Sequence, residues 1–283
     1  MRKFTFAYVA LLALVSYGAL ALFSEGITLP GWRIVAVLSA LTMADYLIKS
    51  YRWRLLLKHY GMHVSFVEAV KTYLAGLMFI LTPAKVGEVV KAELMKKRHG
   101  FSRKKTAFLT LVERAFDMLA HVIIAGAGAL LVATQYLRGV GAVAMLMTLG
   151  VAGLYIFRHR LSFIRDELER LRDVRLVAVS LVLSVVSWGL EVLELLLAVL
   201  YFGRSITLPQ AAFAFSGSLI LGNITLLPGG LGATEVSLAG LLMLFSINKG
   251  LASSITMLIR FTTLWFGFLV GAAMWFLTFH KKL

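Results

Sequence analysis

The sequence predicts an all-α integral membrane protein with about six transmembrane helices and two re-entrant helical hairpins arranged as an inverted repeat. Three observations lead to this fold class. Hydrophobic residues make up 60% of the 283 residues, whereas a soluble domain has roughly 45–50%. Several apolar stretches approach the roughly 20 residues that a helix needs to cross a bilayer. The two halves of the chain also resemble each other.

The internal repeat is clearest around Gly61 and Gly203, which open segments that share the pattern G-x-x-[VI]-[ST]-x-x-[EQ]-A. Each segment continues through an apolar stretch into a break that contains proline and glycine and ends with a glutamate, at 83–88 and at 228–235. Interrupted hydrophobic segments at matching positions in two halves are typical of transporters, whose binding site lies at the repeat interface.

Six uninterrupted apolar stretches are expected to cross the membrane: 4–23, 32–50, 106–134, 140–157, 176–202 and 251–279. The first could instead be a signal peptide, but it exceeds the 7–15 apolar residues typical of one and favours a retained helix. Most basic residues fall on one side of these spans, with Arg52, Arg54 and Lys58 just beyond the second. The positive-inside rule then predicts a multi-pass protein of the cell membrane with both termini in the cytoplasm.

The chain is expected to divide into three parts. Residues 1–157 hold the first repeat together with the span at 140–157, which opens the second repeat. Residues 158–175 read as an amphipathic cytoplasmic linker, because leucine and isoleucine recur at helical spacing between charges. Residues 176–283 complete the second repeat.

Two segments, 65–98 and 208–246, are too long for loops and too broken for crossings. They begin at the capping-box patterns Ser65-x-x-Glu68 and Thr207-x-x-Gln210. A hairpin that enters and leaves by one membrane face is tolerated where protein or water surrounds its free backbone groups. Three crossings separate the two hairpins, so we expect them to enter from opposite faces, which makes the repeats inverted.

Three groups of residues resemble the lysylphosphatidylglycerol synthase transmembrane-region family, also called the flippase-like domain. They are Thr82-Pro83 through Gly87-Glu88, Val112-Glu113-Arg114 with Asp117, and Pro228-Gly229-Gly230-Leu231-Gly232 with Glu235. Lys85 departs from the pattern, since many members have a glycine followed by a basic residue there. In the bacterial multiple peptide resistance factor this domain is associated with moving an aminoacylated lipid across the bilayer. A separate soluble domain attaches the amino acid, and the present chain is expected to be a stand-alone member without it, so lysyl-lipid synthesis is not implied.

Charged residues inside the spans are functional candidates, because a charge at mid-bilayer costs about 2.5–3.5 kcal/mol. We expect Arg114 and Arg260 to flank the two hairpin tips, where helix N-termini and glycine amides suit a phosphate. Alternatively, Arg114 forms a structural ion-pair cluster with Glu113 and Asp117. Arg260 has no carboxylate close to it in its own span. The candidate headgroup ligands are Arg114, Arg260, Lys85, Lys91, Asn223, Gly229, Gly230 and Gly232.

Acidic residues are candidates for gating or proton coupling, namely Glu88, Glu113, Asp117, Glu191, Glu194 and Glu235. Glu191 and Glu194 lie three residues apart, so they share one face of a helix deep in the membrane and suit a bound proton. They could instead be hydrogen-bonded neutral carboxyls at the repeat interface. Glu235 could simply complement the dipole of the helix that it opens. Asp45 and Lys49 are expected to form a structural ion pair.

No catalytic residue, metal site or cofactor site is predicted. The chain has no cysteine, which excludes disulfides and thiol catalysis, and no nucleotide loop or metalloprotease motif occurs. The leading hypothesis is a lipid translocase that moves an anionic or phosphate-bearing headgroup by alternating access at the repeat interface. Coupling of this movement to protons is a further hypothesis. The partners of the translocase would be membrane lipids and not nucleic acid, and the oligomeric state is undetermined. The alternatives are a secondary transporter for a small solute or ion, and a membrane enzyme or a partner of a lipid-modifying enzyme or glycosyltransferase in lipid-linked glycan synthesis.

Overall fold

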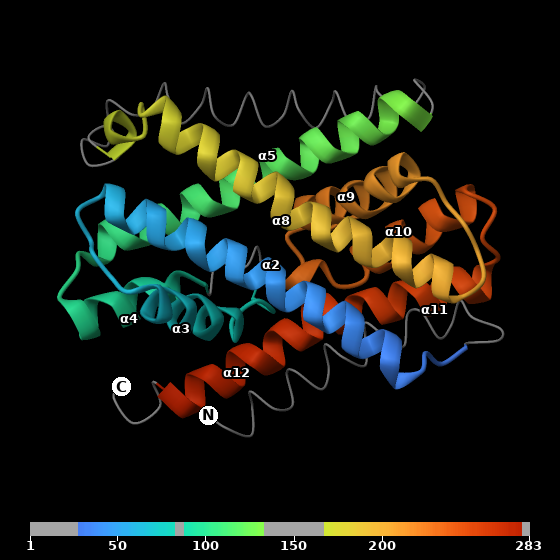
Figure 1. Ribbon diagram of the computed structural model, residues 1–283, viewed down its shortest axis with the longest axis horizontal. Helices are drawn as coiled ribbons and strands as arrows, with labels where there is room; N and C mark the ends of the chain where they lie inside the picture. Colours follow the sequence, from blue (N-terminus) through green and yellow to red (C-terminus); the bar gives the residue numbers. More distant parts are fainter. Residues whose placement is uncertain (1–27, 83–87, 133–166, 279–283) are drawn as a thin grey trace.

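The computed structural model describes residues 28–82, 88–132 and 167–278, and all regular secondary structure in these ranges is helical (Figure 1). The predicted all-α class is therefore confirmed. The expected spans at 4–23 and 140–157 lie outside the described residues, as does the first half of the linker at 158–175.

Four long apolar helical segments are long enough to cross a membrane. They are α2 (Trp32–His59), α5 (Arg103–Val132), α8 (Val174–Tyr201) and the segment Lys249–Thr278. This last segment consists of α11 (Lys249–Arg260), a π-helical turn η5 (Phe261–Trp265) and α12 (Phe266–Thr278). The protein is therefore a multi-pass membrane protein. In Figure 1 the four segments run along the long axis of the molecule, and α2 and α8 lie side by side in opposite directions.

The two broken segments form helical hairpins, as predicted. The first consists of α3 (Phe66–Leu77) and α4 (Val90–His99). The second consists of α9 (Leu208–Ile224), a short 3-10 helix η4 (Pro228–Gly230) and α10 (Ala233–Leu244). Figure 1 shows α3 and α4 at one end of the long helices, and α9 and α10 at the other end.

Side-chain caps begin both hairpins at the predicted residues. The Ser65 hydroxyl oxygen accepts a hydrogen bond from the Glu68 backbone amide over 3.2 Å. Thr207 and Gln210 form the complete reciprocal capping box. These local hydrogen bonds satisfy amides that the first helical turn leaves free, which is why the sequence alone placed both helix starts.

The second span is longer than its predicted bounds of 32–50, because α2 continues to His59. Arg52 was predicted to lie beyond the span with the cytoplasmic charges, and this was wrong. Its side chain is fully buried and its Nη1 donates to Asp117 Oδ1 over 2.6 Å. A charge with a close counter-ion can remain inside the helix bundle, so the charge of Arg52 does not end the span.

Each hairpin packs against a long helix from the other half of the chain, α9 on α5 and α3 on α12. Glycine permits both contacts. A Cβ added to Gly128 of α5 would lie 2.6 Å from the Pro209 carbonyl oxygen and 2.8 Å from the Phe213 nitrogen. A Cβ on Gly271 of α12 would overlap the backbone of Leu77 and Met78. These glycines therefore allow close helix packing, as expected of small residues in membrane proteins.

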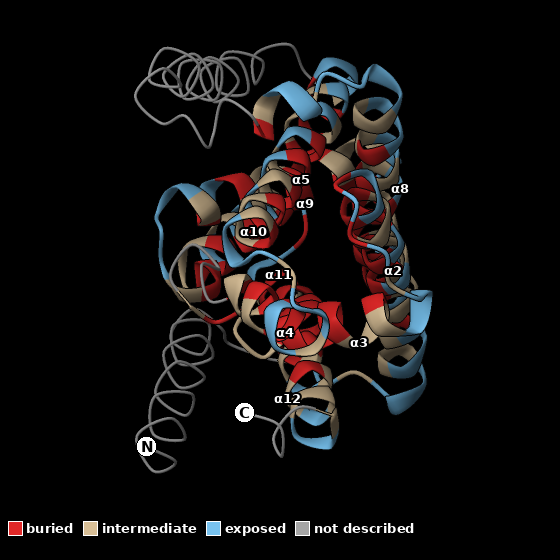
Figure 2. Ribbon diagram, turned by 90° about the vertical axis from the view of Figure 1, so that its left-hand side faces the viewer, coloured by how far each residue is buried: buried red, intermediate tan, exposed pale blue. Residues whose placement is uncertain are grey.

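Buried residues lie mainly on the parts of the long helices that border the interior, whereas exposed residues lie mainly on the outer parts (Figure 2). The outer faces carry large apolar residues, among them Leu111, Val182 and Leu269, each more than half exposed. Such faces suit contact with lipid tails. The interior, in contrast, contains most of the charged side chains described below.

The first hairpin is tied at its open end by Glu68 of α3 and Arg98 of α4, whose Nη1 donates to both carboxylate oxygens over 2.7 and 2.9 Å. Partial burial raises the pKa of Glu68, but the hydrogen bonds and charge of Arg98 outweigh it, so the pKa lies below its ordinary value of 4.5. The ion pair therefore stabilises the folded state at neutral pH, and this contribution is lost as the pH falls below 4.5 through the folded-state pKa.

We accordingly expect Glu68→Gln to lower the thermal midpoint slightly at neutral pH, by the equivalent of about 1 kcal/mol or less, because the pair is partly exposed. The measurement is thermal unfolding of both proteins in detergent across a pH series. The two midpoints should converge in acid. A difference that stays constant down to the lowest pH would contradict this assignment.

Candidate functional site

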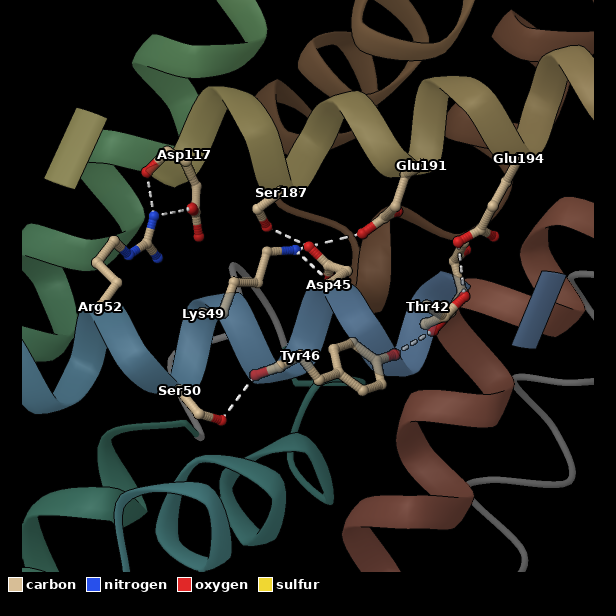
Figure 3. Close-up of polar contacts among 12 residues, drawn as sticks. Thr42, Asp45, Tyr46, Lys49, Ser50, Arg52, Asp117, Ser187, Glu191 and Glu194 are labelled. Atoms are coloured by element: carbon tan, nitrogen blue, oxygen red, sulfur yellow. Dashed lines mark hydrogen bonds and ion pairs between the residues drawn. The ribbon is translucent and has the colours of Figure 1, made fainter. Parts of the chain in front are cut away.

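The buried polar residues of three long helices form stripes at helical spacing. On α8 the stripe is Ser180, Ser184, Ser187, Glu191 and Glu194, and on α2 it includes Thr42, Asp45, Lys49 and Arg52. On α5 it is Thr106, Thr110, Glu113, Asp117 and His121. Residues three and four apart share one face of a helix, so each stripe turns towards the interior. The stripes of α2 and α8 face each other in Figure 3.

Arg52 and Lys91 hold the carboxylates of α5. Arg52 binds Asp117 and the Ser184 hydroxyl, and its Nη2 lies 3.7 Å from Glu113 Oε1. Lys91 of α4 is fully buried and its Nζ lies 2.5 Å from Glu113 Oε2, above the ring of Trp53. Glu113 thus joins the first hairpin to α5. Lys91, a predicted headgroup ligand, is engaged by this carboxylate.

Arg114 contacts Glu88, the first described residue after the break of the first hairpin. Arg114 Nη2 lies 3.2 Å from Glu88 Oε2 and 3.1 Å from Asp117 Oδ2. The expected ion pair of Arg114 with Asp117 along one helix is therefore present. Glu88, at the end of the hairpin break, is a second partner of Arg114. The side chain of Arg114 is 22% exposed, in contrast to that of Arg52, which is fully buried. The tip itself, with Lys85, lies outside the described residues.

Arg260 occupies the matching position at the second hairpin. Its own span offers it no carboxylate, but the hairpin does, since Arg260 Nε donates to Glu235 Oε1 over 2.7 Å. Its Nη2 donates to the Gly229 carbonyl oxygen over 2.7 Å. Glu235 therefore does more than complement its helix dipole. Arg260 and Glu235 join the hairpin to the end of α11.

The glycines at the second tip have backbone conformations that other residues rarely adopt. Gly229, Gly230 and Gly232 have φ values of 59°, 67° and 82°, and left-handed backbone favours glycine. A Cβ on Gly230 would also lie 2.7 Å from Thr234 Oγ1. The Gly230 amide donates to the Leu227 carbonyl oxygen over 2.9 Å. These glycines shape the turn and direct the Gly229 carbonyl towards Arg260.

A second cluster lies where α2 crosses α8 (Figure 3). Lys49 Nζ donates to Asp45 Oδ2 over 2.8 Å and to Glu191 Oε1 over 3.2 Å, and it lies 3.4 Å from the centre of the Trp188 ring. Asp45 also accepts from the Ser187 hydroxyl. The expected ion pair of Asp45 and Lys49 is present. Glu191 of α8 is a second partner of Lys49 that was not predicted.

Glu194 lies one turn beyond Glu191 and is fully buried. Its Oε1 lies 2.9 Å from the Thr42 hydroxyl, which is also 3.1 Å from the Thr262 carbonyl oxygen. The Tyr46 hydroxyl donates to the neighbouring Thr263 carbonyl oxygen over 2.7 Å. Thr262 and Thr263 belong to the π-helical turn. Sequence reasoning missed Thr42 and Tyr46, although both lie in the polar stripe of α2.

A central cavity of about 40 Å³ lies between the two hairpins. Its charged lining residues are Lys49, Glu88, Arg114, Glu191 and Arg260, and Tyr46, Tyr73 and Trp188 line it as well. Both arginines that were expected to flank the hairpin tips therefore face one space. Among the described residues, three cations and two carboxylates surround it, so this part of the lining carries a net positive charge when all are ionised.

A second cavity of about 230 Å³ adjoins the first, since Arg114 and Trp188 line both. Its other polar lining residues are Asp117, His121 and the predicted ligand Asn223. Met118 and Leu226 also line it, and Leu226 is 62% exposed. This residue has a φ of 55°, which is uncommon for a residue with a side chain. The cavity is therefore lined both by Arg114 and by an exposed apolar residue of the second hairpin.

Among the described residues no group of three histidine, aspartate or glutamate side chains is arranged to hold a metal ion. The carboxylates of the two clusters are bound instead by arginine, lysine and hydroxyl groups. The site as a whole can bind charged groups by ion pairs and hydrogen bonds.

Comparison with known proteins places this chain among membrane proteins. A UPF0104 membrane protein of Methanothermobacter thermautotrophicus is 26% identical over 316 residues, which cover 96% of this chain and 92% of the relative. One from Pyrococcus horikoshii is 24% identical, covering 84% of this chain and 85% of the relative. One from Methanocaldococcus jannaschii is 26% identical, covering 71% and 94%. The names of these relatives describe membrane proteins and state no enzymatic activity.

No solved structure matches this chain. The family described as the lysylphosphatidylglycerol synthase TM region matches residues 3–271. The match spans both hairpins and both arginines of the central cavity. This chain therefore belongs to the lysylphosphatidylglycerol synthase transmembrane-region family.

Proposed function

We propose that this protein is a lipid translocase that moves an anionic or phosphate-bearing headgroup across the membrane while the lipid tails remain in the bilayer. The observation that carries the proposal is the central cavity, where Arg114 and Arg260 face one space from the two hairpins. Arginine binds phosphate oxygens through paired, charge-assisted hydrogen bonds. Lys49 adds a third cation to the same lining.

The second cavity supports a lipid over a small solute. It is the larger of the two spaces, with about 230 Å³, and its lining includes Arg114, Asn223 and the exposed Leu226. Neighbouring Leu227 and Ile224 are also about half exposed. A cation beside exposed apolar residues suits a molecule with a charged headgroup and hydrocarbon tails. A small polar solute has no need of the exposed apolar residues.

The packing of α2 against α8 supports an inverted repeat. Lys49 contacts Glu191 and Asp45 contacts Ser187, and both pairs are 142 residues apart. This is also the spacing of Gly61 and Gly203, so residues at matching positions of the two halves meet. The remaining contacts are reciprocal, since Thr42 binds Glu194 while the matching residues Ser184 and Arg52 bind each other. Two antiparallel helices related by a two-fold axis make such contacts.

Alternating access follows from this arrangement. The central cavity has room for water molecules but is too small for a lipid headgroup, so it is closed around Arg260 in this conformation. Rocking of the two halves about the contact between α2 and α8 would enlarge it and admit the headgroup from one side at a time. Arg114 and Trp188 line both cavities, so a headgroup that moved from one to the other would pass them.

The basic residues support an orientation with cytoplasmic termini in the cell membrane. The end of the molecule that holds the first hairpin carries Arg54 and Lys58 of α2 and six basic residues around the α4–α5 junction: Lys96, Lys97, Arg98, Arg103, Lys104 and Lys105. The opposite end of the described helices carries Arg33, Arg204 and Lys249. The positive-inside rule places the first end in the cytoplasm.

Arg114→Ala tests the proposal. Purified protein is reconstituted into vesicles that contain fluorescent phosphatidylglycerol or a fluorescent polyprenyl phosphate, and dithionite added outside quenches the outer leaflet. We expect wild-type protein to move at least one of these lipids faster than empty vesicles do. Loss of a charge-assisted hydrogen bond worth about 1.5–3 kcal/mol should slow Arg114→Ala by about tenfold or more.

Arg103→Ala is the matched control, because Arg103 lies on the same helix and pairs with Glu93 but is 54% exposed. Its rate should equal that of the wild type. If neither lipid moves while a radiolabelled anionic solute enters the vesicles, the protein is a solute transporter and the proposal is wrong. Equal rates for Arg114→Ala and the wild type would remove Arg114 from the path.

A further inference from the structure

We infer that Glu194 binds the proton that drives translocation, and that Thr42 and the π-helical turn at Thr262 form its binding site. The link to translocation rests on the proposed function, whereas the proton site itself rests on the contacts around Glu194. Those contacts involve three oxygens gathered around a single hydroxyl group.

Hydrogen-bond accounting at Thr42 favours an additional proton. Three oxygens lie within 3.2 Å of the Thr42 hydroxyl: Glu194 Oε1 at 2.9 Å, the Thr262 carbonyl at 3.1 Å and the Leu38 carbonyl at 3.2 Å. A hydroxyl has one proton to donate and two lone pairs to accept with. With an ionised Glu194, the carboxylate and two carbonyl oxygens would compete for that one proton.

A proton on Glu194 resolves this arrangement. The protonated carboxyl donates to Thr42 Oγ1, which is then free to donate to the Thr262 or Leu38 carbonyl. The π-helical turn matters here because it breaks the regular helical hydrogen-bond pattern, and both Thr262 and Thr263 present carbonyl oxygens to α2. The separations of 2.9–3.2 Å are those of hydrogen bonds, which favours a proton over a metal cation at this position.

The charges around Glu194 lead to the same conclusion. In the part of the chain that the structure describes, the ionisable groups near it are Glu191 on its own helix and Asp45, Lys49 and Tyr46 on α2. Lys49 is already shared by Asp45 and Glu191. The π-helical turn has the sequence FTTLW and contributes no ionisable side chain, while Arg260, which precedes it, binds Glu235. One lysine therefore serves three carboxylates.

The matching position in the other half shows what Glu194 lacks. By the repeat spacing Glu194 corresponds to Arg52, whose charge is balanced by Asp117 on α5. Near Glu194, the part of the last span that corresponds to the Asp117 region of α5 contains the uncharged residues Thr262 and Thr263. Among the described residues, Glu194 Oε2 has no hydrogen-bond partner although it is buried. An ionised carboxylate is costly in such a place, and a bound proton removes the charge.

Glu191 provides the connection between this site and the transported headgroup. It lies one turn before Glu194 and lines the central cavity, where it accepts from Lys49. A phosphate that enters the cavity competes with Glu191 for Lys49. The proton of Glu194 can then pass to the released Glu191 carboxylate and leave through the cavity, so that proton release accompanies headgroup binding.

Infrared spectroscopy tests the proton site without any transported lipid. Wild-type protein in lipid nanodiscs at neutral pH should show the carbonyl stretch of a protonated carboxylic acid, and Glu194→Gln should remove it. Glu235→Gln is the matched control, because Glu235 is equally buried but paired with Arg260, and should leave the band unchanged. Thr42→Val should shift the band by removing its hydrogen bond, whereas Thr42→Ser should not. A band that is absent in the wild type or survives in Glu194→Gln would overturn the inference.

A transport measurement then separates proton coupling from a structural neutral carboxyl. For one proton per headgroup, a gradient of about one pH unit can support about tenfold accumulation of the fluorescent lipid in one leaflet. Wild-type protein should respond to the imposed gradient, and Glu194→Gln should give the same distribution with and without it. If the band is present but the wild-type distribution ignores the gradient, Glu194 is a structural residue and the coupling role is excluded. If no lipid moves at all, the proposed function fails while the infrared result stands.

Discussion

Arg260→Ala is expected to abolish lipid translocation and to destabilise the protein by about 3–5 kcal/mol. The destabilisation arises because Glu235 would remain buried without the guanidinium that lies 2.7 Å away, and the Gly229 carbonyl oxygen would lose its donor. The translocation defect arises because Arg260 lines the central cavity. Unfolding in detergent and the dithionite assay measure the two effects separately.

A double variant distinguishes the two roles of Arg260. In Arg260→Ala with Glu235→Gln the unpaired buried charge is gone, so much of the stability should return, as happens when both partners of a buried pair are made neutral. Translocation should remain absent, because the phosphate ligand is still missing. If the double variant translocates at the wild-type rate, Arg260 only anchors the second hairpin and plays no part in headgroup binding.

Gly271→Ala is expected to destabilise the protein by about 1–3 kcal/mol, which is the usual cost of an added group where packing is already tight. The new Cβ would overlap main-chain atoms of α3 at Leu77 and Met78. A backbone cannot rotate away as a side chain can, so α3 would have to move off α12. Gly128→Ala should have a similar effect where α5 meets α9, because the carbonyl of Pro209 lies in the way.

The matched control for these substitutions is Gly189→Ala in α8. Gly189 also lies within a long apolar helix, but nothing lies within 4 Å of its added Cβ. Alanine there should be neutral or should stabilise by up to about 1 kcal/mol through its higher helix propensity. Thermal midpoints in detergent compare the three variants. Equal midpoints for Gly271→Ala and Gly189→Ala would show that α3 does not pack against α12 this closely.

Local features of the fold were predictable from the sequence because they depend on neighbouring residues. The capping patterns at Ser65 and Thr207 placed the starts of α3 and α9, since a cap bonds to an amide only three residues away. Apolar stretches of sufficient length placed four of the expected spans. The residues that resemble a known family also indicated the correct membership, which the match over residues 3–271 confirms.

The candidate site was predicted only in part. The polar residues on α2 and α8 recur at helical spacing within apolar spans, yet Thr42 and Tyr46 were overlooked and Arg52 was misplaced. Arg52 was read as a loop charge because a basic residue at the end of an apolar stretch usually marks the membrane surface. Its actual partner, Asp117, lies 65 residues away and is brought to it by the packing of α2 near α5.

The sequence by itself determined the membrane class, the two hairpins and the list of charged residues that must be accommodated inside the bundle. Only the tertiary structure decided which charges neutralise each other. Arg260 pairs with Glu235, 25 residues earlier, and Lys49 with Glu191, 142 residues later. The physical reason is that hydrogen bonding and hydropathy act locally along a helix, whereas a buried charge needs a counter-ion within a few ångströms in space. Which residue supplies that counter-ion depends on how the helices pack.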